Sequence, residues 1–144
     1  MYYTVSFLRC GAKKLSYQKT FSQDVPLNAL TLVRLSDVAD SLNETNLGLS
    51  TQEVAKWAPL MQCPADMWAP LLANETDTRL VRLVKSLTIA EMKLPGWEAG
   101  ARSPVIGIVR ELRRRNAYPK ELTAWIKAHT TNRFLPHGSL ADRL

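Results

Sequence analysis

The pattern of hydrophobic and polar residues divides the chain into a short alternating part and a longer part with helical spacing. Tyr3, Val5 and Phe7 alternate with polar residues, and a second alternating run follows a turn near Gly11. Alternation with a period of two is typical of a half-buried strand. The pattern therefore predicts a β-hairpin over residues 1–24, which must pack on helices or gain a third strand.

A short apolar run over residues 31–35 has two interpretations. It supplies the third strand of the hairpin or it opens a helix, because periodicity does not distinguish the two over so few residues. From Ser36 onward the spacing is helical, and Ser36 is a candidate cap for a helix that runs to about Leu42.

The sharpest local signal is a helix start at Ser50. Ser50 and Glu53 have the spacing of a capping box, and Leu49 and Val54 occupy the two positions of a hydrophobic staple. Pro59 is expected to stop or kink this helix, because proline lacks the amide proton and crowds the preceding turn.

A four-residue sequence, Trp-Ala-Pro-Leu, occurs twice, at residues 57–60 and 68–71. One interpretation is a duplicated docking corner with two tryptophans on one face. The favoured interpretation is coincidence among short helices broken by prolines, with both rings in the core.

Two longer helices are predicted after these segments. The first runs from Thr78 to about Leu94 and is amphipathic, and Pro95 with Gly96 ends it. The second begins with Ser103 as the cap and proline in the first turn, over residues 104–115. Its apolar residues lie on one side of the helix, and they are Val105, Ile108, Val109 and Leu112.

The C-terminal part is predicted to contain one more helix and an irregular tail. Pro119 opens the helix, in which Leu122, Trp125 and Ile126 face inward. Residues 130–144 lack a helical period, and Phe134 and Leu135 are expected to anchor them to the body.

These elements predict one domain of the α+β class, mostly α, over residues 1–144. The hairpin of residues 1–24, with a possible third strand, packs on five or six helices. Residues 36–129 form the helical body, and residues 130–144 form the tail.

Composition narrows the class of protein further. Hydrophobic residues make up 46% of the chain and charged residues 22%, which argues against disorder along its whole length. No apolar run reaches the roughly 18 residues of a membrane span, and no basic leader precedes an apolar stretch, so no membrane partner is expected.

Cys10 and Cys63 stand far apart and are predicted to be free thiols. A cytoplasmic location follows from these points.

The net charge of +6 is unevenly placed. Residues 1–74 are balanced, whereas residues 102–133 hold eight basic and two acidic residues, a difference of +6. These basic residues are the candidate contacts for the phosphates of a nucleic acid or for an acidic protein, and they are Arg102, Arg110, Arg113, Arg114, Arg115, Lys120, Lys127 and Arg133.

Two alternatives accompany the nucleic-acid interpretation. The arginines of residues 104–115 also suit a solvated helix face, since arginine is a good helix former. They also suit a protein-interaction module, such as an adaptor, an inhibitor or an immunity-type protein, whose partner is acidic. Tryptophan and arginine are frequent interface anchors, and the chain has four tryptophans. A helix-turn-helix over residues 50–73 is disfavoured, because its recognition helix would hold no basic residue.

The two histidines provide an enzymatic alternative. His129-Thr130-Thr131 and His137-Gly138-Ser139 each match His-x-Thr/Ser, and such a pair resembles the signature of the two-histidine phosphodiesterases. In that family the motifs lie on separate strands far apart in sequence, whereas here they are eight residues apart. With Arg133, the two imidazoles would form an acid–base pair that cleaves RNA. The favoured interpretation is a helix-end histidine and a surface histidine.

No other motif adds chemistry. The cysteines and histidines lack the close ligand pairs of zinc sites, and no phosphate-binding glycine loop is present. The sequence therefore predicts a non-catalytic binding protein without a cofactor or metal.

Overall fold

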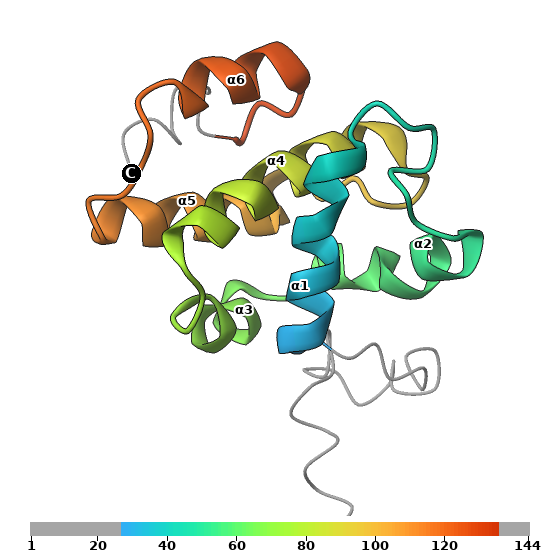
Figure 1. Cartoon of the computed structure of the whole chain (residues 1–144), viewed down its shortest axis with the longest axis horizontal. Helices are drawn as coiled ribbons and strands as arrows, with labels where there is room; N and C mark the ends of the chain where they lie inside the picture. The colour runs from blue at the N-terminus through green and yellow to red at the C-terminus, as the bar shows by residue number, and fades with distance from the viewer. Residues whose placement is uncertain (1–26, 136–144) are drawn as a thin grey trace, which may run out of the picture.

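The structure, a computed structural model, describes residues 27–135 of the chain (Figure 1). Of these residues, 66% are helical and none belongs to a strand. The α-helices are α1 (Ala29–Asp37), α2 (Thr51–Trp57), α3 (Ala65–Leu72), α4 (Asp77–Lys93), α5 (Pro104–Arg114) and α6 (Leu122–His129). Three short 3-10 helices connect them, and they are η3 (Val38–Ser41), η4 (Ala58–Gln62) and η5 (Gly100–Arg102).

The predicted α+β class is wrong, because the described residues contain helices and no strand. The possible third strand, residues 31–35, lies inside α1. Asn28 caps this helix by accepting a hydrogen bond from the Thr31 backbone amide at 3.0 Å. Leu32 and Leu35 are buried three residues apart, which is the spacing of a helix face. The hairpin predicted for residues 1–24 lies outside the described residues.

The start of α1 also corrects the prediction that Ser36 caps a helix. Ser36 lies near the end of α1, and its hydroxyl donates to the carbonyl of Val33 at 2.7 Å. The helix continues as η3 after Asp37, so the helical body begins several residues earlier than predicted.

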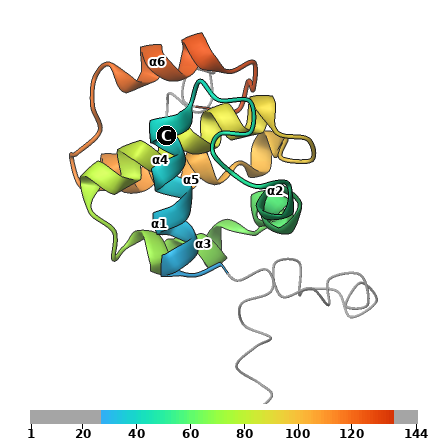
Figure 2. The ribbon, with the colours of Figure 1, turned by 45° about the vertical axis from the view of Figure 1, so that its right-hand side comes forward.

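Helix α4 lies at the centre of the fold. In both Figure 1 and Figure 2, α6 and α3 lie at opposite ends of the molecule with α4 and α5 between them, while α1 crosses α4. The predicted inward residues Leu80, Leu83, Val84 and Leu87 are fully buried, which confirms the amphipathic prediction. Thr88 is buried too, and its hydroxyl donates to the carbonyl four residues earlier at 2.6 Å.

The segment from α2 to α3 follows its local signals. The Ser50 hydroxyl accepts from the Glu53 amide at 3.1 Å, and the Glu53 carboxylate accepts from the Ser50 amide at 2.8 Å, so the capping box is confirmed. At Pro59 the α-helical turn has already changed to η4, as predicted. Trp57 and Trp68, the first residues of the two repeated tetrapeptides, are both buried in the core.

Helix α5 begins and ends with recognisable caps. Ser103 accepts from the Val105 amide at 3.2 Å, and proline occupies the first turn, as predicted. At the other end, the Ala117 amide donates to the Leu112 carbonyl at 2.9 Å, and Asn116 has a positive φ of 56°. This pairing is a Schellman motif with asparagine in the left-handed position. It fixes the backbone at the C-cap, Arg115, and the direction of the chain after it.

Two further expectations are settled in part. Cys63 is disulfide-bonded, so the prediction of a free thiol is wrong for it, and Cys10 lies outside the described residues. Within residues 27–135, no helix has the length and apolar character needed to cross a membrane.

Candidate functional site

The eight predicted cations do not form one cluster. Arg102 lies in η5, just before α5, whereas Arg110 to Arg115 lie towards its other end. Arg133 belongs to the segment that follows α6, and the neighbouring Asn132 amide donates to the carbonyl of Gly100 at 3.1 Å. Arg133 therefore lies on the η5 side of the molecule, about 16 Å of helix away from the end of α5.

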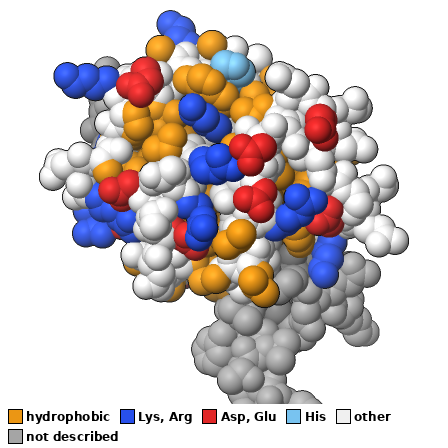
Figure 3. All heavy atoms as spheres, viewed as in Figure 1, with side chains coloured by type: hydrophobic (Ala, Val, Ile, Leu, Met, Phe, Trp, Pro, Cys, Tyr) orange, Lys and Arg blue, Asp and Glu red, His pale blue; other side chains and the backbone are white. Residues whose placement is uncertain are grey.

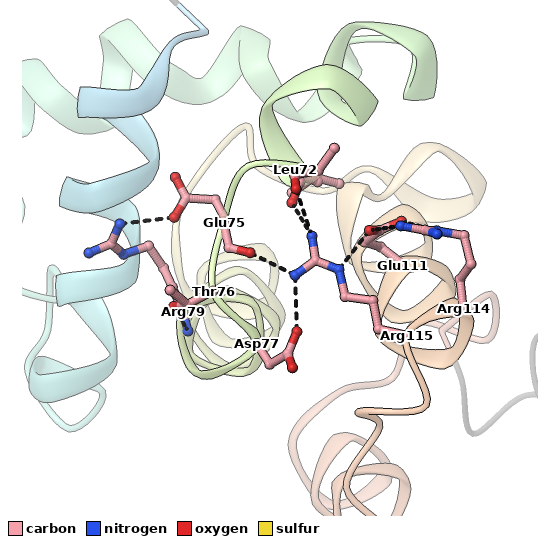
Figure 4. A network of polar contacts seen from close by, with 9 residues as sticks. Leu72, Glu75, Thr76, Asp77, Arg79, Glu111, Arg114 and Arg115 are labelled. Atoms are coloured by element: carbon pink, nitrogen blue, oxygen red, sulfur yellow. Dashed lines mark hydrogen bonds and ion pairs between the residues drawn. The ribbon is translucent and has the colours of Figure 1, made fainter.

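Arg115 is a structural residue and not a surface cation. Its side chain is only 19% exposed, and its guanidinium donates to five oxygens (Figure 4). Three are backbone carbonyls at 2.7–3.0 Å, and two belong to carboxylates at 2.7 and 3.0 Å. The acceptors are the carbonyls of Leu72, Ala73 and Glu75 and the carboxylates of Asp77 and Glu111.

These contacts join the end of α3, the start of α4 and the end of α5. A guanidinium suits this position because its donors form a planar fork, and because cations stabilise the carbonyl ends of helices. The sequence grouped Arg115 with its neighbours because they are adjacent. Its partners at Leu72 and Asp77 lie 43 and 38 residues away, and no local pattern identifies them.

Glu111 is held between two arginines. Arg114 donates to it at 2.9 and 2.7 Å, and Arg115 donates to it at 2.7 Å. These hydrogen bonds, that of Arg114 first, lower the pKa of Glu111 to about 2. The carboxylate is therefore ionised at neutral pH and fixes both side chains. Arg114 nevertheless remains 67% exposed, and Figure 4 shows it on the other side of Glu111 from Arg115.

Four of the predicted cations remain near the end of α5 and face solvent at least in part. Arg110 is exposed and makes no ion pair with any residue in the range 27–135. Arg113 packs over the Tyr118 ring, 4.9 Å from its centroid. Lys120 is exposed in the connection to α6. We call Arg110, Arg113, Arg114 and Lys120 the α5 basic surface.

The three arginines of α1 and α4 have acidic partners, and one of these arginines is Arg79, which pairs with Glu75. Arg34 pairs with Glu53 on the α1 side, and Arg82 pairs with Asp40 at 2.8 Å. Figure 3 shows blue and red side chains next to each other over the face that carries α1 and α4. Such paired surface charges contribute little net field. The unbalanced positive charge of the described residues is therefore mainly at the end of α5 and in the segments that flank α6.

A second arrangement, which the sequence did not indicate as a site, lies between α4 and α6. The rings of Trp125 and His129 are stacked, with centroids 4.0 Å apart and planes 15° apart. The Lys85 ammonium lies 5.5 Å from the centroid of the Trp125 ring. Trp125 is only partly buried, and His129 is exposed. Their spacing of four residues on one helix is the signal that indicates such a pair.

The position of His129 bears on the enzymatic alternative. Its Nδ1 lies 2.7 Å from the backbone carbonyl of Trp125, within the last turn of α6. This is the helix-end histidine that the favoured interpretation expected. His137, its proposed catalytic partner, lies outside the described residues.

Glu91 is a buried acid near the end of α4. It is 5% exposed, and burial raises its pKa to about 7, against the opposing effects of hydrogen bonds from Ser103 and Asn132. The Asn132 amide donates to Oε2 at 3.3 Å, while Oε1 has no partner among the described residues. Leu135 is fully buried, so this predicted anchor of the tail is confirmed, whereas Phe134 is half exposed.

Comparison with known proteins adds no relative. No protein-family model, curated protein or solved structure matches this chain. Within the described ranges, no group of three or more His, Cys, Asp or Glu side chains is placed to hold a metal ion.

Proposed function

We propose that this protein is a non-catalytic binding protein that associates with nucleic acid through the α5 basic surface. The observation that carries the proposal is Arg110, an exposed cation without an ion-pair partner in residues 27–135, one turn before Arg113 and Arg114. Cations three and four residues apart lie on the same side of a helix. A row of arginines of this kind suits phosphate oxygens, which a guanidinium binds in pairs.

Arg114 supports the proposal in spite of its contact with Glu111. Its two hydrogen bonds to that carboxylate hold the side chain in one orientation, and most of its surface still faces solvent. A phosphate bound there gains from a guanidinium that is already ordered, because less side-chain entropy is lost on binding. Arg115 takes no part, because its donors are used within the fold.

The test is fluorescence anisotropy of a labelled DNA duplex and a labelled single strand at increasing salt. The double variant Arg110→Gln, Lys120→Gln removes two exposed cations that have no ion-pair partner among the described residues. We expect the affinity to fall, and the slope of log affinity against log salt to decrease by about 0.7–0.9 for each lost phosphate contact. The control is Lys56→Gln, which removes an exposed cation from α2. Unchanged binding by the double variant, or no binding by the unmodified protein, refutes the proposal.

An acidic partner protein is the second candidate. The half-exposed side chains of Met92 and Phe134 favour it, because hydrophobic side chains at the surface are common at protein interfaces. Affinity capture from a nuclease-treated lysate distinguishes the two candidates. A stoichiometric protein that survives nuclease treatment supports the second, and loss of every bound component supports the first.

We expect no ribonuclease activity, and RNA that is degraded during incubation with the pure protein would contradict this. The cytoplasmic location stays a prediction, and the disulfide at Cys63 removes one of its original arguments, since disulfides are rare in reducing compartments.

A further inference from the structure

We infer that the stacked pair Trp125–His129, with Lys85, is a binding site for an unpaired nucleobase, so that the preferred ligand is single-stranded nucleic acid. This inference rests on the proposed function and goes beyond it by naming the form of nucleic acid. Within a duplex the bases stack on each other, and only an unpaired base is free to stack on a protein ring.

The geometry of the pair suits a base. The two rings are nearly parallel, at 15°, and their centroids are 4.0 Å apart. His129 is exposed at the outer end of this two-ring stack, so a flat base can extend it on the far face of the imidazole. The contact between His129 Nδ1 and the Trp125 carbonyl, at 2.7 Å, holds the imidazole in this orientation. A platform that is ordered before binding loses little entropy when a base arrives.

The charge near the pair is complementary to a phosphate. The Lys85 ammonium lies 5.5 Å from the centroid of the Trp125 ring and adds positive charge beside the stacked pair. In Figure 3 hydrophobic side chains gather over α6 beside a histidine, with basic side chains nearby. Aromatic rings combined with cations are the usual components of surfaces that bind single strands.

The pair also lies close to the α5 basic surface along the chain. Lys120 precedes α6 by two residues, and Trp125 is about 5 Å along the helix axis from Leu122, at 1.5 Å per residue. Tyr118, with Arg113 over its ring, lies in the same connection. One strand can therefore contact the α5 basic surface with its phosphates and the Trp125–His129 pair with a base.

Tryptophan fluorescence gives a direct test, because Trp57, Trp68 and Trp97 are buried and Trp125 alone is partly exposed. The probe is an oligo-dT strand of about 16 nucleotides, the upper end of the usual site size of one small domain. We expect this strand to quench the fluorescence of the unmodified protein. We also expect His129→Ala and Trp125→Phe each to weaken its binding by about fivefold or more. Affinity for a duplex of the same length should change little.

The controls separate this inference from the proposed function. The affinity of Lys85→Gln for oligo-dT is compared with that of Lys56→Gln. The thermal midpoint of each variant confirms that it folds. His129 is exposed, so His129→Ala remains informative even where Trp125→Phe is unstable. The inference is overturned if neither His129→Ala nor Trp125→Phe alters the binding of oligo-dT. That result does not affect the proposal for the α5 basic surface. An equal loss of duplex binding overturns the inference as well. Failure of the unmodified protein to bind any strand overturns both.

Discussion

The guanidinium of Arg115 donates to the backbone carbonyl of Leu72 at 2.9 Å, although 43 residues separate them. The same side chain donates to the carbonyls of Ala73 and Glu75, so one cation satisfies several backbone oxygens where α3 ends and α4 begins. Carbonyls at a helix end lack intrahelical partners. Arg115 therefore supplies additional donors, from the end of one helix, to the carbonyls at the end of another.

Replacing Arg115 with alanine should destabilise the protein by about 2–4 kcal/mol, because several partly buried oxygens lose their donor together. Arg115→Lys should recover only part of this loss, since one ammonium cannot occupy the same planar set of positions. Urea denaturation followed by circular dichroism measures both values. Arg114→Ala is the matched control, and at this exposed neighbour we expect a much smaller loss, because exposed ion pairs contribute little to stability. Similar losses for the two alanine variants would contradict the structural role of Arg115.

The stability of the protein should decrease as pH rises from about 4.5 to about 7. Burial raises the pKa of Glu91 from 4.5 to about 7, so the folded state binds this proton more tightly than the unfolded state. Below pH 4.5 the proton stabilises the folded state fully, by on the order of 3 kcal/mol. This stabilisation is lost by about pH 7. Glu111, with its pKa near 2, stays ionised over this range in the folded protein.

Glu91→Gln should remove this pH dependence and make the protein more stable than the unmodified chain at pH 8. Urea unfolding at pH 5 and pH 8 measures the difference. The control is Glu98→Gln, which changes an exposed glutamate. It should not alter the change in unfolding free energy between pH 5 and pH 8. Parallel pH profiles for the unmodified protein and Glu91→Gln would show that Glu91 does not titrate as described.

Ser50→Ala should cost about 1 kcal/mol of unfolding free energy, because the Glu53 amide loses its acceptor at the start of α2. The Glu53 carboxylate keeps its contact with Arg34 and limits the loss. Thermal denaturation compared with Thr51→Ala, an exposed neighbour in the first turn, isolates the effect of the cap. A loss at Thr51 equal to that at Ser50 would mean that the cap is not the cause.

The two most deeply buried tryptophans should respond differently to replacement by phenylalanine. The Trp97 indole donates to the Val54 carbonyl at 3.0 Å, whereas the Trp68 Nε1 has no acceptor among the described residues. Each change removes similar buried volume, but only Trp97→Phe removes a hydrogen bond. We expect Trp97→Phe to cost about 1 kcal/mol more than Trp68→Phe in urea denaturation. Equal costs would argue against that bond.

The parts of the fold that followed from sequence are those fixed by neighbours in the chain. Ser103 and Pro104 define the start of α5, and α4 was located to within one residue at its start, because caps and helical spacing are local signals. The run over residues 31–35 carried no decisive period. Asn28, three residues before Thr31, is the local signal for the start of α1, because its side chain caps the helix.

The candidate site was predictable only in outline. Counting charges along the sequence places the excess in residues 102–133, but adjacency in sequence groups Arg115 with Arg113 and Arg114. Whether an arginine faces solvent or the fold depends on oxygens that arrive from distant segments, as Asp77 does for Arg115. The Lys85 and Trp125 pairing likewise needs α4 and α6 to be side by side.

The segment after α6 sets a practical lower limit on the length of the protein. The Asn132 side-chain amide donates to the Glu91 carboxylate and Leu135 is fully buried in the core, so these residues belong to the folded body. A variant that ends with α6 would lack Asn132 and would expose the buried Glu91 carboxylate to solvent. Shortened forms intended for binding measurements must therefore extend to Leu135, or a loss of folding will be mistaken for a loss of ligand contacts.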